Sequence, residues 1–101
     1  MDITVQELKK RLDASDASFL FIDVREPYEY QDFNLGAELI PLGTLPTQLS
    51  DLADHKNDEI VVHCRSGARS GQAKDFMMAN GFTNVRNLEG GVLAWIDSFG
   101  R

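Results

Sequence analysis

The chain contains a single cysteine, and the residues around it could make its thiol reactive. An apolar run that starts at Val61 leads into Cys64, and the segment 65–70 that follows contains two arginines, a glycine and two serines. A helical pattern begins within this segment, so the thiol is expected at the C-terminal end of a strand and beside the N-terminus of a helix. Converging backbone N–H groups and positive charge at such a place stabilise a thiolate or a bound anion.

These surroundings would lower the pKa of the Cys64 thiol. An ordinary cysteine thiol has a pKa of about 8.5 and is mostly protonated at neutral pH. A helix N-terminus favours the anion by roughly 0.3–1 kcal/mol, and one pKa unit corresponds to about 1.4 kcal/mol. Arg65 and Arg69 add to this effect if they point inward, and Gly67 can adopt a positive φ that lets the loop curl around the sulfur. A lone cysteine is commonly a buried structural residue, but two arginines in a tight polar turn favour a catalytic nucleophile instead.

Patterns along the rest of the chain alternate between strands and helices. They predict strands at 19–24, 38–40, 59–63 and 84–88, and helices that begin near Val5, Pro27, Thr44, Ala68 and Gly91. This alternation is typical of an α/β domain with a mainly parallel central sheet. Functional sites of such sheets lie at the C-terminal ends of the strands, which is where Cys64 falls, with Asp23 and Arg25 at the same edge.

Caps and helical spacing predict how the helices begin and which side chains they bury. Thr4 is expected to cap the first helix in a capping box, and Thr44 is expected to cap the third. The helix over 68–80 is expected to bury Phe76 and Met77 together with Ala73 on its inner face.

The histidine next to the cysteine suggests a Cys–His pair. Because neighbouring residues of a strand point to opposite faces of a sheet, His63 is instead expected to be a packed structural residue. One cysteine and two separated histidines are too few for a zinc site, so no metal is expected.

Size and composition indicate a single globular domain spanning residues 1–101. The net charge of −6 argues against a nucleic-acid partner, and an anionic substrate would need local attraction from arginines. One cysteine excludes an internal disulfide and fits a reducing compartment. Residues 1–13 lack the apolar core of a signal peptide, and no run approaches the roughly 18 apolar residues of a membrane span. We therefore expect a cytoplasmic protein that does not associate with membranes.

Four segments of the chain, taken together, resemble the rhodanese family of sulfurtransferases. The similarity extends over the whole chain and lies in segments 21–30, 40–42, 64–70 and 88–95, the third being similar to the family's catalytic loop. The resemblance implies a rhodanese-like three-layer α/β/α domain that moves sulfane sulfur from a donor such as thiosulfate to cyanide or a thiol. The sulfur would travel as a persulfide on Cys64 in a ping-pong reaction, without a metal or organic cofactor. A thioredoxin-like or other protein thiol could be the acceptor.

The resemblance also implies roles for the residues that follow Cys64. The N–H groups of the loop would cradle the terminal sulfur of the persulfide, and two arginines would bind the oxyanion of the donor. The expected substrate-binding residues are Arg65, Ser66, Gly67, Ala68 and Arg69.

Other residues are expected to brace the loops around the site. These are Asp23, Arg25 and Ser70, although for Asp23 and Arg25 a structural ion pair or a helix cap is the favoured interpretation. The segment 32–37 departs from the Gly-His-Ile that the family often places before its central Gly-Ala, which would affect the choice of substrate.

Two alternative functions remain open. Some relatives of this fold are phosphatases or arsenate reductases that use Cys-x5-Arg. Here Arg69 follows Cys64 after four residues and Ser70 takes the phosphatase position, which indicates a tighter loop suited to a sulfur atom. The other alternative is a persulfide carrier or protein-interaction module without turnover. Cys64 argues against an inert domain but is compatible with a sulfur relay to a protein.

Overall fold

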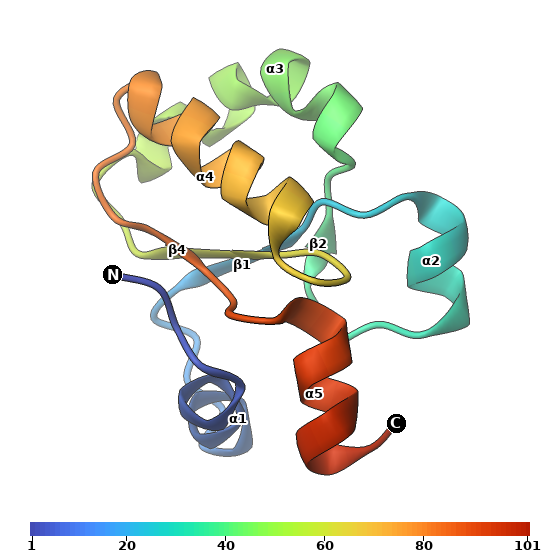
Figure 1. Ribbon diagram of the computed structural model, residues 1–101. Coiled ribbons are helices and arrows are strands. Elements are labelled where there is room, and N and C mark those ends of the chain that lie inside the picture. Colours follow the sequence, from blue (N-terminus) through green and yellow to red (C-terminus); the bar gives the residue numbers. More distant parts are fainter.

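A four-stranded parallel sheet forms the centre of the computed structural model, which describes residues 1–101 (Figure 1). Its strands are β1 (Leu20–Asp23), β2 (Glu38–Leu39), β3 (Ile60–His63) and β4 (Val85–Asn87), in the order β2-β1-β3-β4. Ile22 pairs with Glu38 on one side and with Val62 on the other, and Val62 pairs with Asn87. Because every pair is parallel, all four strands end at one edge of the sheet. The predicted parallel α/β sheet is confirmed.

Helices cover both faces of this sheet. They are α1 (Val5–Asp13), α2 (Pro27–Asp32), α3 (Leu45–Gln48), α4 (Ala68–Ala79) and α5 (Gly91–Phe99), with 3₁₀ turns η1 (Leu42–Thr44) and η2 (Leu49–His55). Figure 1 shows α3 and α4 on one face, α1 and α5 on the other, and α2 beside the edge where the strands end. This arrangement confirms the predicted three-layer α/β/α fold.

Each face of the sheet has its own apolar core, because side chains alternate along the strands. One core joins Ile22, Val62 and Cys64 to Ala73 and Met77 of α4. The other joins Val61 and Leu88 to Val5 and Leu8 of α1, with Phe21 packed against it. The ring centroid of His63 lies 5.3 Å from that of Phe21, so His63 faces away from Cys64, as predicted.

The predictions about helix caps and inner faces are confirmed for Thr4, Ala73 and Met77, and wrong for Phe76 and for the capping hydrogen bond of Thr44. The Thr4 side chain accepts a hydrogen bond from the backbone of Glu7 at 3.1 Å, which confirms this residue as the cap of α1. Thr44 occupies the N-cap position of α3, but its side chain forms no capping hydrogen bond. It ends the preceding 3₁₀ turn, and its hydroxyl donates to the carbonyl of Pro41 at 2.9 Å. Phe76 is 36% exposed, and the buried face of α4 instead contains Ser70, with Ala73 and Met77 as predicted.

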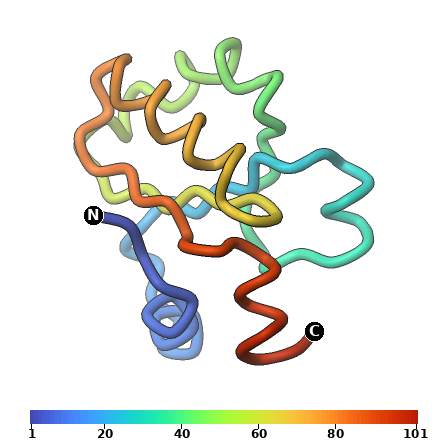
Figure 2. The backbone as a smooth tube through the Cα atoms, in the orientation of Figure 1, coloured from blue at the N-terminus to red at the C-terminus, as the bar shows by residue number.

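The N-terminal segment extends alongside β4, where Figure 2 shows the two chain segments next to each other. The Ile3 N–H donates to the carbonyl of Asn87 at 3.0 Å, and the Glu89 N–H donates back to Ile3 at 2.9 Å. Asp2 accepts hydrogen bonds from the backbone of Asn87 and from Lys74 of α4. These contacts hold the end of β4 against the start of the chain.

No helix of the protein combines the length and the apolar character that crossing a membrane requires.

Candidate active site

Cys64 follows the last residue of β3 and opens a tight loop that ends in α4. In Figure 2 this loop, drawn in yellow, lies close to both α2 and the start of α5. Gly67 precedes α4 with a φ of +105°, a conformation that other residues rarely adopt, as its predicted role in the loop requires. The turn directs backbone N–H groups back toward Cys64, whose residue surface is only 1% exposed.

Three hydrogen bonds converge on the sulfur of Cys64. The N–H of Gly67 lies 3.2 Å from Sγ, the N–H of Ser70 lies 3.4 Å from it, and the Ser70 hydroxyl lies 3.3 Å from it. Burial disfavours the charged thiolate and would raise the pKa of Cys64. The donors from Ser70, Gly67 and Ser66 outweigh this cost, so the pKa of Cys64 is lower than that of an ordinary thiol. The site therefore favours an ionised sulfur.

The Ser70 hydroxyl has a second acceptor, which sequence reasoning missed. Its oxygen lies 2.6 Å from Oδ1 of Asn87, and Nδ2 of Asn87 donates to the carbonyl of Gly67 at 3.0 Å. A hydroxyl has one proton, so it donates either to Asn87 or to the sulfur of Cys64. Ionisation of Cys64 favours donation to the sulfur. Asn87 ends β4 at the edge where β3 leads into Cys64, and this position is the signal that could have identified it.

Removal of the Ser70 hydroxyl should raise the pKa of Cys64. In Ser70→Ala the backbone N–H groups and the burial stay, but one donor to the thiolate is lost. A hydrogen bond of about 1 kcal/mol corresponds to roughly 0.7 pKa units, so alkylation at pH 7 should slow about fivefold. The curve of iodoacetamide alkylation rate against pH should move to higher pH. Ser66→Ala is the matched control, because the Ser66 hydroxyl makes no hydrogen bond. Superimposable curves for wild type and Ser70→Ala would refute this role.

Asp23 and Arg25 form a buried ion pair at the same edge of the sheet. Arg25 donates from Nη2 to Asp23 at 2.8 Å and from Nε to both carboxylate oxygens at 3.1 Å. Nη2 also donates to the carbonyl of Phe33 at 2.7 Å, directly after α2. Burial lowers the pKa of the neighbouring His63 despite attraction from Asp23, which keeps that imidazole neutral. The pair thus connects β1 to the end of α2, which is the structural ion pair considered for Asp23. A bracing effect of this pair on the cysteine loop 64–70 stays a prediction.

The two arginines of the loop have different surroundings. Nη1 and Nη2 of Arg69 donate to the two carboxylate oxygens of Glu29 at 2.7 and 2.9 Å. The hydrogen bonds from Arg69 lower the pKa of Glu29 to about 2, so the pair is ionised at neutral pH. Arg65 is exposed and its side chain makes neither a hydrogen bond nor an ion pair. Sequence reasoning missed Glu29, which lies in the first turn of α2.

Backbone N–H groups at the start of α5 hydrogen-bond to the cysteine loop. The N–H of Val92 donates to the carbonyl of Cys64 and the N–H of Leu93 donates to the carbonyl of Arg65, both at 3.0 Å. Gly91 makes this close approach possible, since a Cβ on it would lie 2.6 Å from each of those carbonyl oxygens. Gly91 also has a φ of +57°.

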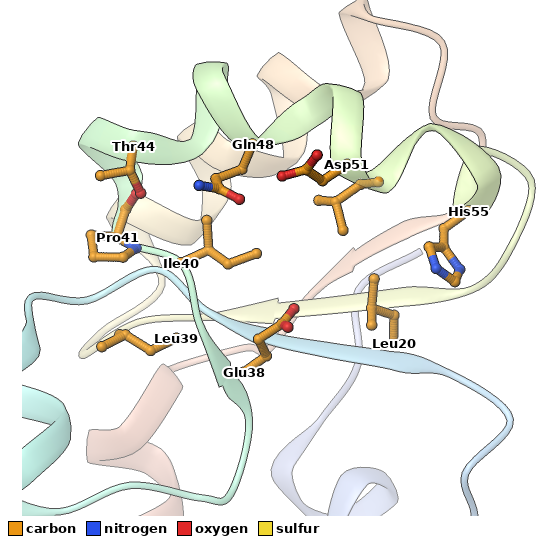
Figure 3. Close-up of a pocket in the computed structure, with 10 residues that line it drawn as sticks. Leu20, Glu38, Leu39, Ile40, Pro41, Thr44, Gln48, Asp51 and His55 are labelled. Carbon is orange, nitrogen blue, oxygen red and sulfur yellow. The ribbon is translucent and has the colours of Figure 1, made fainter.

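Two cavities of the protein are candidate substrate sites. The larger, of about 530 Å³, lies between β2 and the helical segment of α3 and η2 (Figure 3). Glu38, Asp51 and His55 contribute to its lining, but no residue of the loop 64–70 does. The smaller, of about 250 Å³, lies between α2 and α5 and includes Arg65 in its wall. We call the smaller cavity the α2–α5 groove, and it is the one adjacent to the cysteine loop.

Comparisons with known proteins find relatives over most of the chain. A family model described as the rhodanese-like domain matches residues 4–98. A sulfurtransferase of Allochromatium vinosum is 37% identical over 95 residues, covering 93% of this chain and 86% of that protein. The thiosulfate sulfurtransferase PspE of Escherichia coli is 39% identical over 71 residues, covering 69% of this chain and 68% of that protein. The crystal structure of a rhodanese-like domain protein from Staphylococcus aureus superposes with a TM-score of 0.81 at 34% identity, over 94% of this chain and 91% of that one.

Proposed function

Because the chain belongs to the rhodanese-like domain family, we propose that it transfers sulfane sulfur through a persulfide on Cys64. The observation that carries the proposal is the set of three hydrogen bonds that converge on one buried sulfur. They stabilise a thiolate, which is the nucleophile that this chemistry needs. The same N–H groups are suited to hold the negative charge of a persulfide.

With thiosulfate as donor, the Cys64 thiolate attacks the outer sulfur. The S–S bond of thiosulfate breaks, its electron pair leaves with sulfite, and the outer sulfur becomes the terminal atom of a persulfide anion. Cyanide or a thiol then attacks that terminal sulfur and restores the thiolate. Each step conserves charge and needs no oxidant or reductant. Arg65 would bind the oxyanion of the donor, and the loop 65–69 would surround the transferred sulfur.

A phosphatase or arsenate reductase is less well supported. Such an enzyme needs an arginine whose donors are free to hold a tetrahedral oxyanion. Both terminal nitrogens of Arg69 instead face the carboxylate of Glu29. The loop also closes directly on Sγ of Cys64, so its N–H groups donate to the sulfur atom itself.

Mass spectrometry of the intact protein tests this function. After treatment with thiosulfate or an organic sulfane-sulfur donor, the mass should increase by about one sulfur atom, and the gain should map to Cys64. Cyanide should then remove the sulfur as thiocyanate over repeated cycles. A single loading that only a protein thiol can discharge would indicate the carrier function instead. Hydrolysis of an aryl phosphate without any sulfur gain would contradict the proposal.

A further inference from the structure

The carboxamide of Asn87 is fixed in position by the cysteine loop. Its Nδ2 donates to the carbonyl of Gly67 at 3.0 Å, and its Oδ1 accepts from the Ser70 hydroxyl at 2.6 Å. A carbonyl oxygen can only accept, so the contact with Gly67 determines which end of the amide faces Ser70. The backbone is held as well, because the N–H of Asn87 donates to Asp2 at 3.0 Å. Asn87 therefore presents an immobile acceptor to the Ser70 hydroxyl.

This acceptor competes with the sulfur of Cys64 for the single proton of the Ser70 hydroxyl. The hydroxyl oxygen lies 2.6 Å from Oδ1 of Asn87 and 3.3 Å from Sγ. A thiol sulfur is a weak acceptor, so the hydroxyl donates to Asn87 while Cys64 is protonated. A thiolate is a charged acceptor and forms the stronger bond, so the hydroxyl turns toward it. The proton stays on the Ser70 oxygen throughout, and only the O–H bond rotates.

The competition has opposite consequences for the two states of the sulfur. Ser70 is fully buried, and a thiolate that takes its hydroxyl leaves Oδ1 of Asn87 without that donor, which costs free energy. In a persulfide the negative charge lies on the terminal sulfur, and the inner sulfur of Cys64 is neutral. The hydroxyl can then return to Asn87. Asn87 thus opposes the free thiolate and favours the sulfur-loaded state.

We propose that Asn87 is a positioning residue of the active site that acts on Cys64 through the Ser70 hydroxyl. It binds this hydroxyl whenever the inner sulfur is neutral and releases it when that sulfur is ionised. The return of the hydroxyl in the persulfide rests on the proposed function. Because a thiolate is a stronger nucleophile when the pKa of its thiol is higher, this competition also keeps Cys64 reactive.

The charged groups nearest to this arrangement are already paired. Behind β4, Lys74 donates to Asp2 at 2.7 Å, and beside the sulfur Arg69 donates to Glu29 at the same distance. Burial opposes ionisation of Asp2, but hydrogen bonds from Lys74 and from a backbone N–H lower its pKa. The hydrogen bonds from Arg69 lower the pKa of Glu29 to about 2. Both carboxylates therefore stay ionised while Cys64 titrates.

A double-mutant cycle between Ser70→Ala and Asn87→Leu tests this role. Leucine has nearly the shape of asparagine, and the Gly67 carbonyl keeps the hydrogen bond from the N–H of Gly71 at 2.9 Å. The measurement is the midpoint of the iodoacetamide alkylation rate against pH, in the wild type, the single variants and the double variant. Without Ser70 the leucine can act only through Gly67. With Ser70 present, the same change should place the midpoint about 0.7 pH units lower relative to that reference, which corresponds to about 1 kcal/mol.

Two further variants guard the cycle against a change in folding. Asn84→Leu is the matched control, because Asn84 is exposed directly before β4 and its side chain makes no hydrogen bond, so its curve should superimpose on that of the wild type. Asn87→Ala also removes Oδ1 and should show coupling to Ser70→Ala of the same sign. Circular dichroism and melting temperatures identify the variants that are folded.

NMR of the wild type tests the same role without a substitution at Asn87. Its side-chain amide signals should titrate together with Cys64, and they should return toward their low-pH positions once sulfur is loaded. In Ser70→Ala the titration of these signals should shrink to about half or less, since only the direct field of the thiolate remains. The side-chain amide of Asn80, which donates to the carbonyl of Phe76, is the internal reference and should not titrate.

Two results would overturn this inference while the proposed function stands. One is zero coupling, or coupling of the opposite sign, in folded Asn87→Leu and Asn87→Ala. The other is an Asn87 amide that titrates equally in Ser70→Ala and in the wild type. Alkylation and titration use the unloaded protein, so they report on Asn87 independently of sulfur transfer. If they give the expected results but no donor places sulfur on Cys64, the proposed function fails and the role of Asn87 toward the thiolate remains.

Discussion

Replacement of Cys64 by serine should abolish sulfur loading and lower thiocyanate formation by roughly 10³-fold or more. A serine hydroxyl does not ionise near neutral pH and forms no stable sulfur adduct, so neither half of the ping-pong cycle can proceed. The measurements are the intact mass after donor treatment and the rate of thiocyanate formation.

The fold should survive this change, because serine has nearly the same size and the donors around Sγ can bind an oxygen equally well. Comparable melting temperatures for wild type and Cys64→Ser would show that the lost activity is chemical. Ser66→Ala should remain active, since the Ser66 backbone rather than its hydroxyl supports the sulfur. Undiminished turnover in Cys64→Ser would remove the mechanism.

Gly91→Ala should destabilise the protein by about 2–4 kcal/mol. A Cβ there would lie 2.6 Å from the carbonyl oxygens of Cys64 and Arg65, and the residue would keep a positive φ. Left-handed backbone costs roughly 1–2 kcal/mol for a non-glycine residue, and forced displacement of packed neighbours costs roughly 1–3 kcal/mol. For a domain of this size the melting temperature should fall by about 10 °C or more. Any folded fraction should react slowly with iodoacetamide, because the loop that supports Sγ is displaced.

Two other glycines separate the causes of this effect. A Cβ on Gly36 would meet nothing within 4 Å although φ is +87°, so Gly36→Ala measures the backbone cost alone. Gly43 has open space and an ordinary φ, so Gly43→Ala should be nearly neutral. A Gly91→Ala variant no less stable than Gly36→Ala would show that the close approach to the loop is unimportant.

Predictions from the sequence succeeded where one segment was sufficient to determine the outcome. The strand predicted at 59–63 appears as β3, and the Thr4 cap of α1 is present, because apolar runs and caps act through neighbours in the chain. The prediction for Phe76 failed because Ser70 takes the inner face of α4. There its hydroxyl meets Cys64 and Asn87, and Asn87 belongs to a strand 17 positions further along.

Local sequence patterns therefore determined the parallel α/β fold, the family, and the placement of Cys64 in a tight loop between a strand and a helix. Only the tertiary structure decided which charges remain available at that loop. Glu29 lies 40 positions from Arg69, and nothing in the sequence indicates that its carboxylate would occupy both terminal nitrogens of that guanidinium. Ion pairs and shared hydrogen bonds of this kind depend on distances between separate elements. Those distances are set by the packing of helices on both faces of the sheet.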